Sequence, residues 1–134
     1  MNACTCYSGR PFKQCCAPLL KGVKKAPDPL TLMRSRFSAY SLGEVGYLIR
    51  TTAPEYRTGL KKEELKAWCD ATRWTGLRIL ESGVEAAHPD RGYVRFEADY
   101  DYDGSAHTHR EFSRFEKIDY AWYYTDGDVE VEDE

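Results

Sequence analysis

Residues 93–117 read YVRFEADYDYDGSAHTHREFSRFEK, and this stretch determines the fold class. Its first ten residues alternate between apolar and charged side chains, which predicts a strand with one face in a core. The apolar face consists of Val94, Phe96, Ala98 and Tyr100. Asp103-Gly104 follows, a typical signal for a tight hairpin turn. The stretch therefore predicts two antiparallel strands, of which the second covers residues 107–117.

Two segments that flank this hairpin also have the character of strands. Residues 74–86 (WTGLRILESGVEA) can form a strand, and residues 88–92 (HPDRG) are expected to form the turn into the hairpin. Residues 121–126 (AWYYTD) predict the last strand. A run of strands joined by short turns favours one antiparallel sheet.

The first half of the chain has a helical period instead. Asp28 and Pro29 predict a helix start, with the aspartate as cap and the proline in the first helical position. Gly43 is expected to end this helix. Its apolar residues recur at helical spacing and are Leu30, Met33, Phe37 and Tyr40. With further helices expected over residues 44–52 and 62–71, the fold class is α+β, with helices packed on a curved antiparallel sheet.

The N-terminal segment carries a cluster of cysteines with the pattern Cys4-x-Cys6-x(8)-Cys15-Cys16. Four thiolates satisfy a tetrahedral zinc ion, and Ser8-Gly9 suits the chain reversal that would bring the two pairs together. A segment this short cannot bury a core of its own, so a metal would supply the folding free energy. Two disulfides and four free thiols are the alternatives. Cys69, within a helical pattern, is interpreted as inert packing.

Charge is distributed unevenly along the chain, whose net charge is −3. Residues 126–134 (DGDVEVEDE) are acidic, whereas residues 1–25 contain bases and no acid. The basic residues of this head are Arg10, Lys13, Lys21, Lys24 and Lys25. They suggest an anionic partner, either nucleic acid or an acidic protein surface; a solvated face is the alternative.

The bulk composition bounds the class of protein. A chain of 134 residues with 42% hydrophobic residues is the size of one domain with a small appendage. No run approaches the roughly 18 apolar residues of a membrane span, and the first residues contain no apolar signal region. We therefore expect a soluble, cytoplasmic protein with no membrane partner.

The cysteine segment, residues 4–16 (CTCYSGRPFKQCC), resembles the SEC-C motif, a zinc-binding head also found at the C-terminus of the SecA translocation motor. The motif usually reads Cys-Pro-Cys-Gly-Ser-Gly-Lys, followed by an aromatic residue and Cys-Cys or Cys-His. Here Thr5 and Tyr7 replace the proline and the glycine, which affects turn geometry more than the metal. The resemblance implies one structural zinc ion per chain, held by Cys4, Cys6, Cys15 and Cys16.

The resemblance extends to the YchJ family over nearly the whole chain. It rests on residues 26–29 (APDP), 32–40 (LMRSRFSAY), 47–49 (YLI), 74–77 (WTGL), 111–115 (EFSRF) and 122–127 (WYYTDG). Such proteins join a SEC-C head to a cone-shaped domain of the nuclear transport factor 2 and ketosteroid isomerase type. Many members carry a second SEC-C motif, where this chain has its acidic tail. The implied division is a head over residues 1–17, a linker over 18–29, a cone over 30–126 and a tail over 127–134. Cones of this type often pair through the sheet, so a homodimer is one expected assembly.

A cone encloses a pocket, which is the default place to look for a ligand or a reaction. Candidate pocket residues are Arg34, Arg36, Tyr40, Trp74, His109, Glu111, Ser113 and Trp122. Glu111 is the sharpest candidate for a base, because strand alternation puts it on one face with His109 and Ser113. The alternative is that Glu111 pairs with Arg34 or Arg36 across a helix–sheet seam, while His109 is solvated.

Three functions are consistent with these patterns. The preferred hypothesis is a non-catalytic zinc-binding adaptor that meets a protein or the ribosome through its basic head. The second is a small isomerase or dehydratase that uses Glu111. The third is a carrier of a small apolar ligand in the cone. No nucleotide loop or hydrolase motif favours an enzyme.

Overall fold

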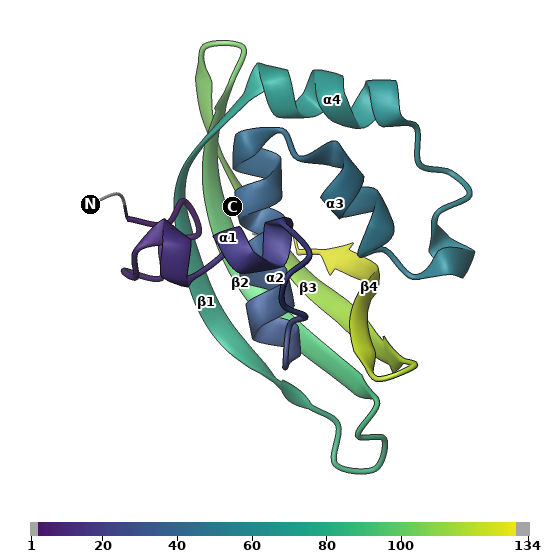
Figure 1. Ribbon diagram of the computed structural model, residues 1–134. Coiled ribbons are helices and arrows are strands. Elements are labelled where there is room, and N and C mark those ends of the chain that lie inside the picture. Colours follow the sequence, from purple (N-terminus) through teal and green to yellow (C-terminus); the bar gives the residue numbers. More distant parts are fainter. Residues whose placement is uncertain (1–2, 131–134) are drawn as a thin grey trace.

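The computed structural model describes residues 3–130 and has an α+β fold. A four-stranded antiparallel sheet in the order β1-β2-β3-β4 curves around the helices, which cover one of its faces (Figure 1). The helical elements are η1 (Phe12–Gln14), α1 (Ala17–Leu20), α2 (Pro29–Leu42), α3 (Val45–Arg50), η2 (Pro54–Tyr56) and α4 (Lys62–Ala71). The strands are β1 (Thr72–Val84), β2 (Arg91–Tyr102), β3 (Ser105–Ile118) and β4 (Ala121–Val129). This confirms the predicted fold class.

Helix α2 lies at the centre of the molecule, and its ends are those that the sequence predicts. The Asp28 side chain accepts a hydrogen bond from the Thr31 amide at 2.7 Å, and Pro29 takes the first helical position. Gly43 ends the helix with a φ of 73°, a conformation that costs other residues more than glycine. The start of α2 lies so close to β2 that a Cβ at Gly92 would collide with Pro29.

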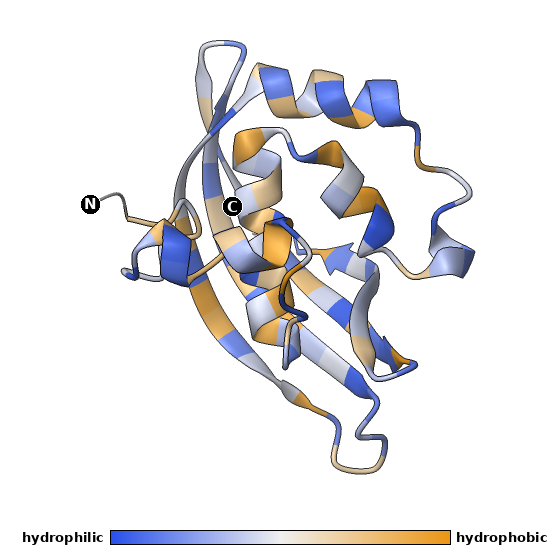
Figure 2. Cartoon of the chain, in the orientation of Figure 1, coloured by the Kyte–Doolittle hydropathy of each residue, from blue (hydrophilic) through white to orange (hydrophobic). Residues whose placement is uncertain are grey.

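The sheet owes its curvature to irregular pairing. β1 and β2 change register between Trp74 and Gly76 and again between Ile79 and Glu81, and bulges of this kind bend and twist a strand. Hydrophilic and hydrophobic residues alternate along β2 (Figure 2). The concave face forms the core with α2, through a cluster that comprises Leu32, Met33, Phe37, Val94, Phe96, Ala98, Phe115 and Trp122.

The opposite face of the sheet is charged, and its charges pair across the strands. Arg78 bonds Asp99 at 2.8 Å and Glu97 at 3.1 Å. Arg95 pairs with Glu81 and with Glu130. Because most of these side chains are partly exposed to solvent, each pair stabilises the fold only slightly.

The C-terminal acids differ from the prediction of a separate tail that begins at residue 127. β4 continues to Val129, and Asp126 and Asp128 both bond the guanidinium of Arg114 on β3. Hydrogen bonds from Arg114 lower the pKa of both carboxyls. Both acids are therefore paired within the sheet, where the single charge of Arg114 compensates one of their two negative charges. The remainder of the predicted tail, residues 131–134, lies outside the described residues.

The segment predicted as a linker, residues 18–29, also differs from expectation. Its start belongs to α1, and Leu19 is 6% exposed in a second core cluster with Ala39, Val45, Tyr47, Leu48 and Cys69. Arg50 donates a hydrogen bond to the Leu20 carbonyl at 2.8 Å. The reason is that Leu19 and Leu20 are apolar and pack against the helices. In a solvated linker, both side chains would be exposed to water. Among residues 3–130, no helix is long and apolar enough to cross a membrane.

Candidate metal centre and cone pocket

The N-terminal head brings together the four cysteines that the sequence singles out. Their sulfur atoms all lie within 4.8 Å of one another, and all but Cys15 are buried. The Sγ atoms of Cys6 and Cys15 are 3.6 Å apart and those of Cys15 and Cys16 are 3.9 Å apart. Such separations are far longer than a disulfide bond, and all five cysteines of the chain are free thiols. Four soft donors in one compact group can hold a metal ion.

The backbone of the head closes as a tight loop around the sulfurs. The Cys4 amide donates to the Arg10 carbonyl at 2.8 Å, and Ala3 and Pro11 form a β-bridge. Gly9 adopts a φ of 85°, as the predicted reversal at Ser8-Gly9 requires. Tyr7 has a φ of 62°, which explains why a glycine is usual at this position of the motif. Its ring contacts Phe37 of α2 at a centroid distance of 6.0 Å, which offsets part of the strain.

Hydrogen bonds surround the cysteine cluster and attach it to α2. Ser8 Oγ lies 3.2 Å from Cys15 Sγ, and Ser38 Oγ lies 3.6 Å from Cys4 Sγ. Thr5 donates to Ser38 at 2.9 Å, and Arg34 donates to the Cys6 carbonyl at 2.9 Å. Polar atoms held in this way fix the orientation of potential ligands.

The thiols of the cluster form hydrogen bonds with one another. A hydrogen bond from Cys16 lowers the pKa of Cys6 to about 4, against the opposing effect of burial, and the same hydrogen bond raises the pKa of Cys16. One thiolate therefore forms readily, and a bound cation would favour loss of the remaining protons.

The five basic residues of the head are all exposed, but they lie on different segments. Arg10 and Lys13 belong to the cysteine loop, and Arg10 donates to the Gln14 carbonyl at 2.7 Å. Lys21 follows α1 directly. Lys24 and Lys25 line a hollow of about 240 Å³ together with Arg50 of α3. Within residues 3–130, no carboxylate forms an ion pair with any of the five.

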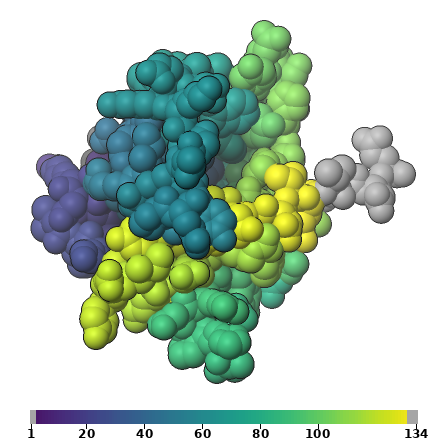
Figure 3. All heavy atoms as spheres, turned by 90° about the vertical axis from the view of Figure 1, so that its right-hand side faces the viewer, coloured from purple at the N-terminus to yellow at the C-terminus, as the bar shows by residue number. Residues whose placement is uncertain are grey.

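The concave side of the sheet encloses a cavity of about 400 Å³ between α2, α4 and the strands. Its walls are mostly aromatic, and its polar groups come from α2, β3 and β4. In Figure 3 the surface is hollowed between the teal helices and the green strands. Six of the predicted pocket residues line this cavity, namely Arg36, Tyr40, Trp74, His109, Glu111 and Ser113.

Two predicted pocket residues lie elsewhere. Arg34 faces the head, where it bonds the Cys6 carbonyl. Trp122 is buried in the core and borders the hollow beside Lys24 and Lys25. Arg34 and Arg36 are two residues apart on a helix, which turns their side chains to different sides. The alternation of β4 gives Trp122 and Tyr124 one face, but only Tyr124 reaches the cavity.

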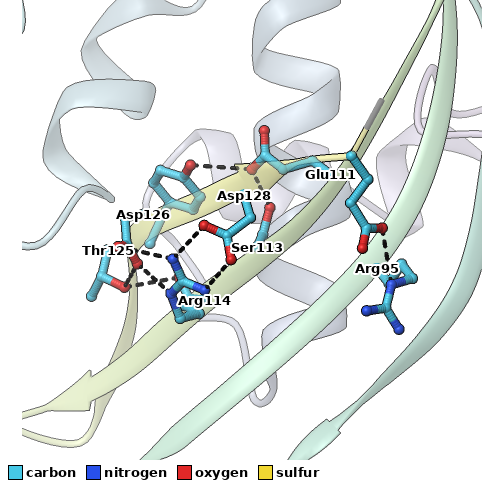
Figure 4. A network of polar contacts seen from close by, with 9 residues as sticks. Arg95, Glu111, Ser113, Arg114, Thr125, Asp126 and Asp128 are labelled. Carbon is cyan, nitrogen blue, oxygen red and sulfur yellow. Dashed lines mark hydrogen bonds and ion pairs between the residues drawn. The ribbon is translucent and has the colours of Figure 1, made fainter. Parts of the chain in front are cut away.

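Glu111 is the centre of a hydrogen-bond network in the cavity. Ser113 donates to the Oε2 atom of Glu111 at 2.5 Å (Figure 4). Tyr124 donates to the same oxygen at 3.1 Å, and His109 Nε2 lies 2.9 Å from Oε1. The predicted ion pair of Glu111 with Arg34 or Arg36 is absent from the described part of the chain. His109, which was expected to be solvated, is 29% exposed, and its ring bonds Glu111 and contacts Phe96.

Arg36 is occupied by other groups. Its Nη1 donates to the Leu48 carbonyl at 2.9 Å and to Thr51 Oγ1 at 2.8 Å, and its guanidinium lies 4.5 Å from the centre of the Tyr124 ring. These oxygens become available because α3 ends beside α2. Arg36 therefore links the helices to β4 and forms no ion pair with Glu111.

Sequence reasoning missed several residues of the cavity. Two of them could have been found from the sequence pattern. Strand alternation places Tyr124 on the same face as Trp122, and helical spacing places Trp68 on the same face as Cys69. Gly127 gave no such signal. It pairs with Ser113, and a Cβ at this position would collide with the Glu111 carboxylate. A glycine on the neighbouring strand thus makes the space in which Glu111 lies.

The fold and the head together define a class: a nuclear transport factor 2-like cone that carries a SEC-C-type cysteine cluster. The family model described as YchJ, middle NTF2-like domain, matches residues 28–127. A UPF0225 protein of Geobacter sulfurreducens is 39% identical over 94% of this chain and 78% of its own length. The chain therefore belongs to the YchJ-like family.

Solved structures agree with this assignment. A SEC-C motif containing protein from Rhodopseudomonas palustris is 35% identical, with a TM-score of 0.87 over 98% of this chain and 100% of that one. A second, from Psychrobacter arcticus, is 26% identical, with a TM-score of 0.81 over 100% of this chain and 80% of that one. A putative Ca/calmodulin-dependent kinase II association domain from Exiguobacterium sibiricum shares the fold alone, at 14% identity and a TM-score of 0.59 over 78% of this chain and 91% of that one.

Proposed function

We propose that this protein is a zinc-binding adaptor whose metal-stabilised head presents a basic surface to an anionic macromolecular partner. The observation that carries the proposal is the group of four sulfurs. Sulfurs 2.3 Å from a central zinc ion form a tetrahedron with edges of about 3.8 Å. The separations of 3.6 Å and 3.9 Å between Cys15 and its two neighbours are close to that value.

The metal would act as a structural element and not as a reaction centre. All four ligand positions are filled by cysteine, which leaves no open site for substrate. The outer hydrogen bonds from Ser8 and Ser38 support the sulfurs on two sides. Anchored to α2, the head would hold its exposed bases in a fixed place on the cone.

The basic surface supports a partner that is anionic. Lys24, Lys25 and Arg50 converge on one hollow, and the aromatic residues beside them are Tyr47, Trp122 and Tyr123. Cations that have no acid nearby attract a polyanion at long range and gain when its counterions are released. The adaptor role, the cytoplasmic location and the homodimer remain predictions.

The experiment compares two pairs of lysines, each pair being adjacent in the sequence. Lys24→Glu with Lys25→Glu removes part of the proposed surface, and the control, Lys61→Glu with Lys62→Glu, makes the same charge change at the exposed start of α4. Each tagged protein is used to capture partners from a bacterial lysate over a series of salt concentrations. We expect the first pair to abolish salt-sensitive capture and the control pair to retain it, with about one zinc per chain in both by elemental analysis.

Equal capture by all proteins, with unchanged salt sensitivity, would overturn the electrostatic adaptor. Zinc below a tenth of an equivalent in carefully purified wild-type protein would overturn the metal. Deletion of the head is a poor substitute for these variants, because it would remove the contacts of Thr5 and Cys4 with α2 and expose that part of the helix.

A further inference from the structure

The cone cavity contains a carboxylate without a fixed cationic partner. The Glu111 side chain is 14% exposed, and among the described residues its only ion-pair partner is His109, which is charged only when protonated. The single arginine that lines the cavity, Arg36, instead bonds Leu48 and Thr51. Burying a carboxylate is costly unless other groups compensate for the lost hydration.

The compensating groups are hydrogen-bond donors. Burial by itself would raise the pKa of Glu111, but hydrogen bonds from His109 and Ser113, with a further one from Tyr124, outweigh it and hold the pKa below the usual value. A carboxylate of this kind stays ionised at neutral pH. It is also a weak base, since an efficient general base has a pKa near the working pH. The arrangement thus favours recognition of charge over removal of a proton.

The walls of the cavity suit a positive charge as well. Eight aromatic rings line it, from Phe37, Tyr40, Trp68, Trp74, Phe96, Tyr100, Phe115 and Tyr124. The face of an aromatic ring is negative and attracts organic cations. The wall already holds one cation in this way, because the Arg36 guanidinium lies over Tyr124.

We propose that the cone cavity binds a small organic cation, an ammonium group on an apolar body, with the charge beside Glu111 and the body against the aromatic rings. The volume of about 400 Å³ lies in the range of small-molecule sites. An anion would meet the Glu111 charge at close range. A neutral ligand would leave that charge unused. The site is separate from the cysteine cluster and does not depend on the adaptor function.

Three matched probes test the sign of the charge. Benzyltrimethylammonium is the cation, neopentylbenzene is its neutral carbon isostere, and phenylacetate is the anion. Each is titrated into the full-length, zinc-containing protein and followed by amide and indole NMR shifts. We expect the cation to bind at least about tenfold more tightly than its isostere, with shifts at Trp68, Trp74 and Tyr100.

Three variants then test whether Glu111 is the group that recognises the positive charge of the ligand. Glu111→Gln keeps the shape of the side chain and should weaken binding of the cation about tenfold without weakening binding of the isostere. Glu116→Gln, on the same strand but on the other face, should change neither. Trp68→Leu should weaken the cation more than the isostere, and this variant keeps the test valid if Glu111→Gln folds poorly.

Equal binding of cation and isostere would overturn the proposal and make the cavity an apolar carrier site. Tighter binding of phenylacetate would overturn it in favour of Arg36 as the anchor. Absence of binding by all three probes would also reject it.

Discussion

The head and the cone each bury polar groups, but they build their sites in different ways. The cysteine cluster comes from one short loop, over residues 4–16, and its four sulfurs converge within 4.8 Å. The Glu111 network is assembled from two strands, with His109, Ser113 and Tyr124 as donors. The head is held together by side chains that could share a metal, whereas the cone is held by apolar packing and carries its carboxylate as a charge that must be compensated.

This difference decides how each region should respond to change. A loop with almost no core would depend on the proposed metal, so losing one ligand would remove its main source of stability. A cone with a large core tolerates local changes and transmits them mainly through close contacts. The two regions also touch, through Thr5, Arg34 and Ser38. The predictions below test how independent they are.

The largest effect is expected from loss of a cysteine. Cys16→Ser should reduce zinc from about one equivalent to almost none by elemental analysis. It should also remove hydrogen-exchange protection from the amides of residues 3–17. Because the head docks on α2, the melting temperature of the cone should fall by roughly 8 °C, which corresponds to about 2 kcal/mol. Cys69→Ser, a buried cysteine outside the cluster, is the control and should keep its zinc.

An unfolded cone after Cys16→Ser, or in the presence of a strong chelator, would show that the head and the cone are a single cooperative unit. A fully protected head without metal would show the opposite, that packing alone maintains the loop.

The second prediction concerns the cone. Gly127→Ala places a methyl group against Glu111 and should cost about 2 kcal/mol, measured by urea denaturation. Gly59→Ala is the control, because a Cβ there meets nothing within 4 Å; it should be neutral or slightly stabilising. Zinc content should be unchanged in both. If Gly127→Ala is as stable as the control, Glu111 can move freely and the network is not a built site.

A smaller effect is expected from pH. The folded-state pKa of Glu111 is lowered from the ordinary 4.5, so its ionised form contributes stability at neutral pH. That contribution is lost as the pH falls from about 4.5 through the lower folded-state value. Wild-type protein should therefore lose more stability between pH 6 and pH 3 than Glu111→Gln, as measured by urea denaturation at each pH. Zinc release at low pH affects both proteins and cancels in the comparison. Identical pH profiles would mean that Glu111 has its ordinary pKa.

The smallest effect is expected at Tyr7. Tyr7→Gly relieves the strain of a positive φ but removes the ring contact with Phe37. The two terms oppose each other, so the net change in unfolding free energy should be under about 1 kcal/mol, with full zinc content. A loss of several kcal/mol would show that the Tyr7 ring is a main anchor of the head.

Much of this molecule could be predicted from its sequence, because the relevant signals are local. Asp28, Pro29 and Gly43 specify the ends of α2 through their own backbone preferences. Alternation in residues 93–102 fixes which face of β2 enters the core, since successive side chains of a strand point to opposite sides. The spacing of the four cysteines likewise indicates a shared ligand site.

Other features required the tertiary structure, because they depend on atoms that are distant in the chain. From the sequence, either Arg34 or Arg36 could pair with Glu111. In the structure, Arg36 bonds a carbonyl and a hydroxyl oxygen at the end of α3, and Arg34 bonds the Cys6 carbonyl in the head. The sequence predicted a separate acidic tail from residue 127, but Asp126 and Asp128 both pair with Arg114 across β3 and β4. Leu19 is buried only because α2 and α3 meet beside it. Sequence alone determined the main elements and the cluster of four cysteines through local geometry, whereas the partner of each buried charge was decided by which groups the fold brings within hydrogen-bond distance.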